Sequence, residues 1–241
     1  MRQEPDERLI VALDVEGLPR ARELVGLLKD RVRMFKVGSR LFTAEGPRVV
    51  EMIRRQGGRV FLDLKFHDIP SVVAEAAREA VKIGAFMLTL HALGGRKMLQ
   101  EAMEAANEEA LRRSLEKPLL LGVTVLSSFD ETSLRETLST RLSLQEQVLA
   151  LMRLVKESGL DGVVASPQEI APIRAMGGKS LVVVAAGVRP LGSRHDDQKR
   201  ALTPKEAIEK GADFIVVGRP IIQAPDPVAA TERILAEMGQ D

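Results

Sequence analysis

The sequence predicts a single-domain (β/α)8 barrel, the TIM-barrel fold of the α/β class, spanning residues 1–241. Three observations support this fold class. Short runs rich in Val, Ile, Leu and Phe alternate with helical patterns along the whole chain, as expected for β-α units that build a parallel sheet. Eight such units can be counted, and 241 residues is an ordinary length for this barrel. Polar residues also recur where the apolar runs end, which is where the active sites of these barrels lie.

The expected strands are eight short apolar runs. Each run is followed by apolar residues spaced three and four apart, which is the period of an amphipathic helix. The connection over 130–158 is long enough to hold two helices. The runs cover residues 9–14, 33–38, 59–64, 86–92, 119–126, 162–166, 181–187 and 214–218.

Two helix starts can be read from their capping residues. Thr203, Pro204 and Glu206 combine an N-cap, a proline at the first helical position and an acid that reaches back, which together form a capping box. Asp226 before Pro227 is a simpler N-cap. Both starts fall where the alternation of strands and helices requires a helix.

The chain carries no sign of a second domain. No linker, low-complexity segment or change of composition divides it, and no repeat is visible beyond the β-α alternation. An open, doubly wound sheet is the alternative architecture. That fold usually has a G-x-G-x-x-G turn after its first strand, and no such turn follows residues 9–14. The closed barrel is therefore the favoured prediction.

Composition argues against several classes of function. With 35 basic and 34 acidic residues the formal charge is +1, so no global field attracts nucleic acid or an anionic membrane. Trp and Tyr are absent and only seven Phe are present, which argues against a platform for stacking bases. The absence of cysteine excludes disulfides, thiolate metal sites and a cysteine nucleophile.

The first residues, MRQEPDERLIVALD, lack the apolar core of a signal peptide, and no apolar run approaches the length of a membrane span. These features predict a cytoplasmic protein without a membrane or nucleic-acid partner.

Charged and hydroxyl side chains stand at or just after the ends of the expected strands. Because the carboxyl ends of the strands meet at one rim of the barrel, these residues are expected to surround one site. They are Asp14, Lys36, Asp63, Lys65, His91, Thr124, Ser127, Ser166, Arg189 and Arg219.

The stretch VFLDLKFHDIPS, residues 60–71, concentrates charge at the end of the third strand. Side chains alternate between the two faces of a strand, so Asp63 and Lys65 should point the same way, about 7 Å apart. Lys36 from the neighbouring strand can lie beside them. Such charges keep one another ionised and impose a directional field on a bound molecule. The alternatives are a structural ion-pair network at the rim, a helix cap formed by Asp68, and a loop-orienting role for His67.

A metal site is a second chemical interpretation of this stretch. Asp63, His67 and Asp68 are all possible ligands of a divalent cation. Lys65 argues against it, because an ammonium group among the ligands repels the metal ion. The sequence therefore predicts no metal.

A long irregular segment, residues 187–202, precedes the eighth strand unit. Loops of this length in compact domains are usually lids or binding loops. The segment carries Arg189, Gln198 and a possible hinge at Gly192. After the eighth strand, Gly218 and Arg219 precede a short helical turn, which is where barrels of this kind often bind phosphate.

These features together identify a resemblance that covers the whole chain. The blocks that carry it are VALD at 11–14, FKVG at 35–38, FLDLKFHDIP at 61–70, GVTVLSS at 122–128, GLDGVVASPQE at 159–169, GVRP at 187–190, DQKR at 197–200 and VGRPI at 217–221. In these blocks the chain resembles the orotidine 5'-phosphate decarboxylase family, and DLKFHDIP is the most specific of them. The resemblance implies a homodimeric barrel that converts orotidine 5'-phosphate to UMP and carbon dioxide, the last step of pyrimidine nucleotide synthesis, without metal or organic cofactor.

The resemblance also implies roles for the charged residues. Lys36, Asp63, Lys65 and Asp68 correspond to the charged tetrad of the family, and Asp68 is expected to serve the active site of the partner subunit. Asp14, together with Lys36, is expected to bind the ribose hydroxyls.

The remaining site residues are implied to hold the rest of the substrate. Ser127 and Ser166 are expected to contact the pyrimidine. Ser127 stands where the family usually has Thr, and Ser71 stands where Asn is common. The residues expected to hold the phosphate or close the lid are Arg189, Gln198, Gly218 and Arg219.

Two other functions fit the same barrel and phosphate site. One is a metal-dependent sugar-phosphate decarboxylase or aldolase, which requires a divalent ion. The other is a non-catalytic nucleotide-binding barrel, which binds UMP and turns nothing over.

Overall fold

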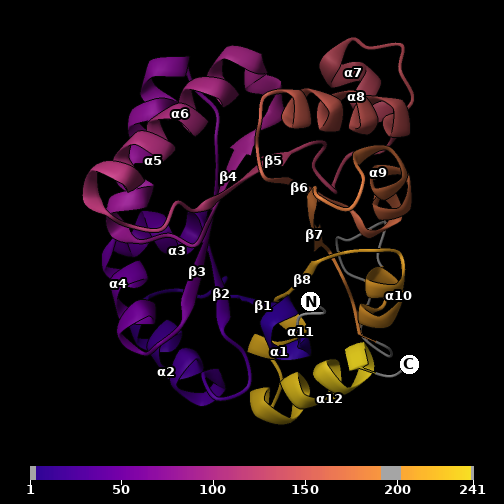
Figure 1. Cartoon of the computed structure of the whole chain (residues 1–241). Helices are drawn as coiled ribbons and strands as arrows, with labels where there is room; N and C mark the ends of the chain where they lie inside the picture. The colour runs from indigo at the N-terminus through magenta and orange to yellow at the C-terminus, as the bar shows by residue number, and fades with distance from the viewer. Residues whose placement is uncertain (1–3, 191–201, 240–241) are drawn as a thin grey trace.

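The computed structural model describes residues 4–190 and 202–239 and shows a closed barrel of eight parallel strands in the order β1 to β8 (Figure 1). β8 pairs with β1 to close the sheet. The predicted fold class is confirmed, and all eight predicted strands are present with ends that differ by a few residues. The strands are β1 Leu9–Ala12, β2 Met34–Gly38, β3 Arg59–Phe66, β4 Met87–His91, β5 Leu119–Val123, β6 Gly162–Ala165, β7 Val182–Ala186 and β8 Phe214–Val217.

Helices surround the strands as an outer ring (Figure 1). The connection after β5 holds two helices, as predicted. No helix in the described ranges is long and apolar enough to cross a membrane. The helices are α1 Pro5–Arg8, α2 Leu18–Leu28, α3 Ser39–Glu45, α4 Arg48–Arg55, α5 Pro70–Ile83, α6 Gly95–Arg113, α7 Glu131–Leu138, α8 Leu144–Glu157, α9 Ile170–Gly177, α10 Pro204–Glu209, α11 Arg219–Ile222 and α12 Pro227–Gly239, with 3-10 turns η1 Ala92–Gly94 and η2 Pro167–Glu169.

Capping residues mark the starts of these helices. Thr203 caps α10, since its hydroxyl accepts from the Glu206 N–H at 3.2 Å while the Glu206 carboxylate accepts from the Thr203 N–H at 2.8 Å. The Asp226 carboxylate accepts from the Ala229 N–H at 3.0 Å in the first turn of α12. Both predicted helix starts are confirmed.

The barrel interior has its own apolar cluster, separate from the larger core between strands and helices. Every strand contributes to it, because alternate side chains of each strand point inward. Its buried members are Ile10, Ala12, Met34, Phe61, Met87, Leu121, Val123, Val164, Val184, Phe214 and Val216.

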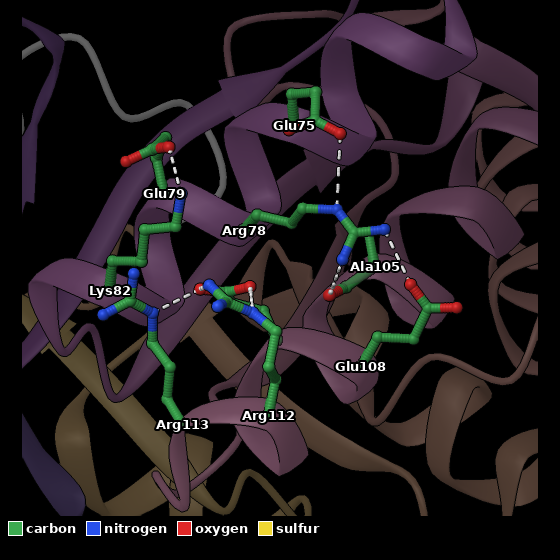
Figure 2. A network of polar contacts seen from close by, with 9 residues as sticks. Glu75, Arg78, Glu79, Lys82, Ala105, Glu108, Arg112 and Arg113 are labelled. Carbon is green, nitrogen blue, oxygen red and sulfur yellow. Dashed lines mark hydrogen bonds and ion pairs between the residues drawn. The ribbon is translucent and has the colours of Figure 1, made fainter.

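A network of charged side chains joins α5 to α6 on the outside of the barrel (Figure 2). Arg78 of α5 pairs with Glu75 on its own helix and with Glu108 of α6, and it also donates to the Ala105 carbonyl oxygen. Surface ion pairs each contribute little, but this guanidinium contacts both helices at once. Arg78 therefore links α5, the helix that follows the DLKFHDIP segment, directly to α6.

Glu109 is the buried acid of this outer network. Its carboxylate accepts hydrogen bonds from Arg112 and Arg113. These bonds lower the pKa of Glu109 from 4.5 to about 2. An acid whose pKa falls on folding stabilises the folded state above its unfolded pKa, and this stabilisation is lost as the pH falls toward the folded pKa.

Glu109→Gln is therefore expected to lower the melting temperature near neutral pH, and the difference from wild type should shrink between about pH 4.5 and about pH 2. Thermal unfolding of both proteins across this range measures the effect. Glu104→Gln, on an exposed position of the same helix, is the matched control. A difference that stays constant down to the lowest pH at which both proteins fold contradicts the assignment.

Candidate active site

A cavity of about 450 Å³ opens at the carboxyl ends of the strands. Residues near or just after the carboxyl ends of β1, β2, β3, β5, β6, β7 and β8 line it, so the predicted convergence of strand ends on one site is observed. Nine of the predicted binding or catalytic residues are among those that line it: Asp14, Lys36, Asp63, Lys65, Ser127, Ser166, Arg189, Gly218 and Arg219. Gln198 and Gly192 lie outside the described residues.

The alternation of side chains explains why these residues meet. Met34 and Phe61 point into the barrel, so Lys36 and Asp63, two residues further along, face the same interior nearer the mouth. Val164 and Ser166 repeat this relation on β6. Apolar residues thus close the interior below, and polar residues of the same inward series form the floor of the cavity.

Acidic and basic side chains alternate in a row along the floor of the cavity, in the order Asp14, Lys36, Asp63 and Lys65. The Lys65 Nζ lies 2.8 Å from Asp63 Oδ1, and the Lys36 Nζ lies 3.4 Å from Asp63 Oδ2. The Lys36 Nζ is also 3.3 Å from Asp14 Oδ1. Asp63 and Lys65 therefore do point the same way, and Lys36 lies between two acids.

Asp63 remains ionised despite its burial, with 8% of its surface exposed. Burial alone raises the pKa of a carboxyl group. The charges of Lys36 and Lys65, with hydrogen bonds from Lys65 and Thr89, outweigh that effect and lower the pKa of Asp63. At neutral pH the cavity therefore presents a fixed negative charge between two ammonium groups.

Thr89 was not identified from the sequence, although it contacts both Asp63 and Lys65. Its hydroxyl accepts from the Lys65 N–H at 2.8 Å and lies 3.1 Å from Asp63 Oδ1. Its position in the sequence could have indicated this. Met87 points into the barrel, so Thr89, two residues further along β4, should point inward as well.

Gly38 makes room for the pair of Lys36 and Asp14. A Cβ atom at this position would lie 3.1 Å from the Lys36 Nζ and 3.2 Å from Asp14 Oδ1. Contacts this short are tighter than most Cβ contacts, so the end of the Lys36 or Asp14 side chain would have to give by a few tenths of an ångström. The glycine at the end of β2 therefore leaves room for the close approach of these charges.

Within a single chain, Asp68 lies apart from the charged side chains on the floor of the cavity. It is exposed, its carboxylate accepts from the Ile69 N–H at 2.6 Å, and it is not among the described residues that line the cavity. The residue at the N-cap of α5 is Ile69, and no side-chain hydrogen bond caps this helix. Capping of the helix therefore does not explain Asp68.

His67 and His91 stack at the same rim, with ring centroids 5.2 Å apart. The His91 Nδ1 accepts from the Leu93 N–H at 3.3 Å. Burial, followed by the charges of His67 and Lys65, lowers the pKa of His91, so its imidazole is neutral at neutral pH. In the part of the chain that the structure describes, no three His, Asp or Glu side chains gather as a set of metal ligands.

The opposite arc of the rim carries hydroxyl groups and cations. The Ser166 N–H donates to the Glu169 carboxylate at 3.0 Å, while the Ser166 Oγ is buried without a hydrogen-bond partner. Arg189 is almost fully buried and donates to the Val188 carbonyl oxygen at 3.0 Å. Ser166 and Arg189 both line the cavity, so this part of the rim presents a hydroxyl group and a guanidinium group to it.

For three residues, the position relative to the cavity differs from what the sequence suggested. Arg40 and Gln223 line the cavity although the sequence did not single them out. Thr124 is fully buried and is not among the described residues that line the cavity. Val123 points into the barrel, so its neighbour Thr124 points to the other face of the strand.

Comparison with known proteins shows which family the chain resembles in sequence and in structure. The model of the family described as "Orotidine 5'-phosphate decarboxylase / HUMPS family" matches residues 7–234. A protein of Moorella thermoacetica named orotidine 5'-phosphate decarboxylase is 49% identical over 238 residues, covering 99% of this chain and 94% of its own. Its counterpart of the same name in Syntrophotalea carbinolica is 52% identical over 235 residues, covering 98% and 96%. The crystal structure of orotidine 5'-phosphate decarboxylase from Lactobacillus acidophilus has a TM-score of 0.86 and 38% identity, covering 98% of this chain and 100% of its own.

Proposed function

The chain belongs to the orotidine 5'-phosphate decarboxylase / HUMPS family and acts as a carboxy-lyase on orotidine 5'-phosphate, and we propose that Lys36, Asp63 and Lys65 carry this reaction. The observation that carries the proposal is the buried, ionised Asp63 held between two ammonium groups on the floor of the cavity. This arrangement suits a reaction in which negative charge develops on carbon and is then quenched by a proton.

The chemistry of the substrate explains why ammonium groups are needed. When the bond between C6 and the carboxylate breaks, carbon dioxide leaves and the electron pair stays on C6. No neighbouring group of the pyrimidine ring can take up this pair, so fixed charges of the protein must stabilise it. Lys65 can do this and can then transfer a proton from its Nζ to C6, giving UMP. The neutral amine recovers its proton from solvent.

Asp63 acts mainly by positioning the two lysines in this proposal. Its two carboxylate oxygens face different ammonium groups, Oδ1 toward Lys65 and Oδ2 toward Lys36. Because these contacts exist before substrate binds, the charges need little rearrangement during the reaction, and such preorganisation is the main source of electrostatic catalysis.

The rest of the cavity is assigned to the rest of the nucleotide. Asp14 and Lys36 are proposed to bind the ribose hydroxyls, and Ser127 and Ser166 to contact the pyrimidine. The place of both serines in the lining of the cavity supports the latter assignment. The phosphate is proposed to bind at the ends of β7 and β8, next to Arg189, Gly218 and Arg219. Gln198, which is not among the described residues, is assigned to the same group.

The proposed phosphate site lies across the rim from Lys65, since β7 and β8 are four and three strands away from β3 in the closed sheet. Contacts there are therefore remote from the proposed proton donor. They can still lower the barrier, because binding energy from a remote group can organise the reacting end of the substrate.

The activity can be tested by mixing the protein with orotidine 5'-phosphate in excess chelator and following the orotate absorbance. Loss of absorbance in chelator supports the cofactor-free decarboxylase. Turnover that appears only after a divalent metal is added supports the metal-dependent alternative, and UMP binding without turnover supports the non-catalytic barrel.

Arg219→Ala is expected to reduce kcat/KM for orotidine 5'-phosphate by at least about tenfold, because a charged hydrogen bond to phosphate contributes about 1.5–3 kcal/mol. The same variant should lose little on orotidine, which lacks the phosphate and should be a poor substrate of the wild type. Neither added metal nor a change of pH should restore the loss. Equal losses on both substrates would show that Arg219 does not serve the phosphate.

We further propose a homodimer in which Asp68 of one chain completes the active site of the other. Asp68 is exposed and outside its own cavity, and exposed apolar side chains lie near it in sequence or on the adjacent turn after β4. Ile69 is 63% exposed, Val72 48% and Leu93 41%. Burial of these side chains on association would be favourable.

The product suggests a place in metabolism. We propose that the enzyme supplies UMP to pyrimidine nucleotide synthesis in the cytoplasm. Growth without uracil of a bacterial strain that lacks its own decarboxylase, when this chain is expressed in it, tests the pathway; cell fractionation tests the location.

A further inference from the structure

β3 and β4 lose their regular register at the active site. Leu62 pairs with Leu88 and Phe66 pairs with Leu90, so three residues of β3 stand opposite Thr89 alone. At this irregularity Lys65 has a φ of 50°, in the left-handed region that residues other than glycine rarely adopt. Such a conformation persists only where surrounding contacts hold it.

The Thr89 hydroxyl takes the place of the missing ladder contacts. It accepts the Lys65 N–H at 2.8 Å and can donate its own proton to Asp63 Oδ1, 3.1 Å away. One fully buried oxygen atom therefore links the backbone of Lys65 to the carboxylate that pairs with the Lys65 side chain. The hydroxyl closes a small ring made of Asp63, Lys65 and Thr89.

We propose that Thr89 is a positioning residue for decarboxylation, which fixes the bulge in β3 so that the Lys65 ammonium group stays beside Asp63. This inference rests on the proposed role of Lys65 as proton donor. Thr89 itself is not among the described residues that line the cavity, so it acts through the other two.

The hydrogen bonds of the Thr89 hydroxyl distinguish this role from ordinary packing in the core. The β4 position needs a small inward side chain, which Val provides as well as Thr, but of these two only Thr has a group that can accept and donate a hydrogen bond at once. Without it, Lys65 loses the partner of its N–H and Asp63 loses one of its donors. Misplacement of a reacting group by about 1 Å can cost about a hundredfold in rate.

The test compares Thr89→Val, which removes the hydroxyl at nearly constant volume, with Thr89→Ser, which keeps it. We expect the Val variant to lose about tenfold to a hundredfold in kcat, with KM for orotidine 5'-phosphate changed little because the phosphate site is intact. The Ser variant should retain most of the activity. Since the Thr89 hydrogen bond lowers the pKa of Asp63, the acid side of the kcat profile of the Val variant should move to higher pH.

Thr231→Val is the matched control. Thr231 is equally buried, and its hydroxyl donates to the Pro227 carbonyl oxygen at 2.8 Å on α12, away from the cavity. It should keep the wild-type kcat and pH profile, whatever its effect on melting temperature. If Thr89→Val does not fold, Thr89→Ala and Thr89→Ser give the same comparison, because they differ in the hydroxyl alone.

A Val or Ala variant whose kcat stays within about threefold of the Ser variant, with an unchanged acid limb, overturns the inference. Wild type assayed in parallel separates this result from a failure of the proposed function. If wild type does not decarboxylate orotidine 5'-phosphate, the function is wrong; if it does and Thr89→Val does equally well, only the role of Thr89 is wrong.

Discussion

Lys65→Ala should lower kcat by about a thousandfold or more and leave UMP binding detectable. A general acid typically contributes about a hundredfold to ten-thousandfold, and Lys65 also stabilises the developing charge. Its main interactions are expected in the transition state, so the affinity for the product should change far less than the rate. Product formation and UMP affinity are measured on the same preparation.

The control for this experiment is Lys97→Ala, an exposed lysine on α6 with 82% of its side chain accessible. It should match the wild type in both measurements. If Lys65→Ala retains more than about a tenth of the wild-type kcat, less than about 1.4 kcal/mol of barrier stabilisation has been lost. Such a small loss would rule out Lys65 as the proton donor.

Mixing two inactive variants, Lys65→Ala and Asp68→Ala, should restore roughly a quarter of wild-type activity if Asp68 serves the partner chain. In a two-fold symmetric dimer each site then combines Lys65 of one chain with Asp68 of the other. A mixed dimer therefore has one site with both defects and one site with neither. Random reassociation of equal amounts makes half the dimers mixed, and half of their sites are intact.

The experiment denatures the two variants together, refolds them and compares their activity with each variant refolded alone. Lys65→Ala refolded with the double variant Lys65→Ala, Asp68→Ala is the negative control, since none of its sites has Lys65. If mixed dimers are shown to form and no activity returns, Asp68 acts within its own chain or not at all. That outcome would remove the shared site and leave the cavity assignments unchanged.

The fold was predictable because its signal is local. Each β-α unit repeats the same two periods, and turn chemistry such as Thr203 with Glu206 marks helix starts on its own. The ends of the strands were predicted less exactly. β3 continues through Phe66, beyond the expected residue 64, because Phe66 still pairs with Leu90 after the shift in register.

The charged cluster was predictable for a similar reason. A spacing of two residues places Asp63 and Lys65 on one face, and adjacent strands bring Lys36 beside them. Thr89 and Gly38 were not, since their importance depends on contacts between strands. The Thr89 hydroxyl matters because the register shifts opposite it, and Gly38 matters because two charges of other residues meet above it. The role proposed for Asp68 requires a second chain, which one sequence does not place.

The closed sheet also limits how this protein can associate. Each of the eight strands is hydrogen-bonded to a neighbour on both sides, so the barrel has no edge strand. An exposed edge is the usual template on which a foreign strand adds to a sheet, in aggregation and in peptide capture alike. The barrel strands offer none, so contact with a partner must be made by side chains and loops outside the sheet. The segment after β3, with Asp68 and Ile69 exposed, is one such surface.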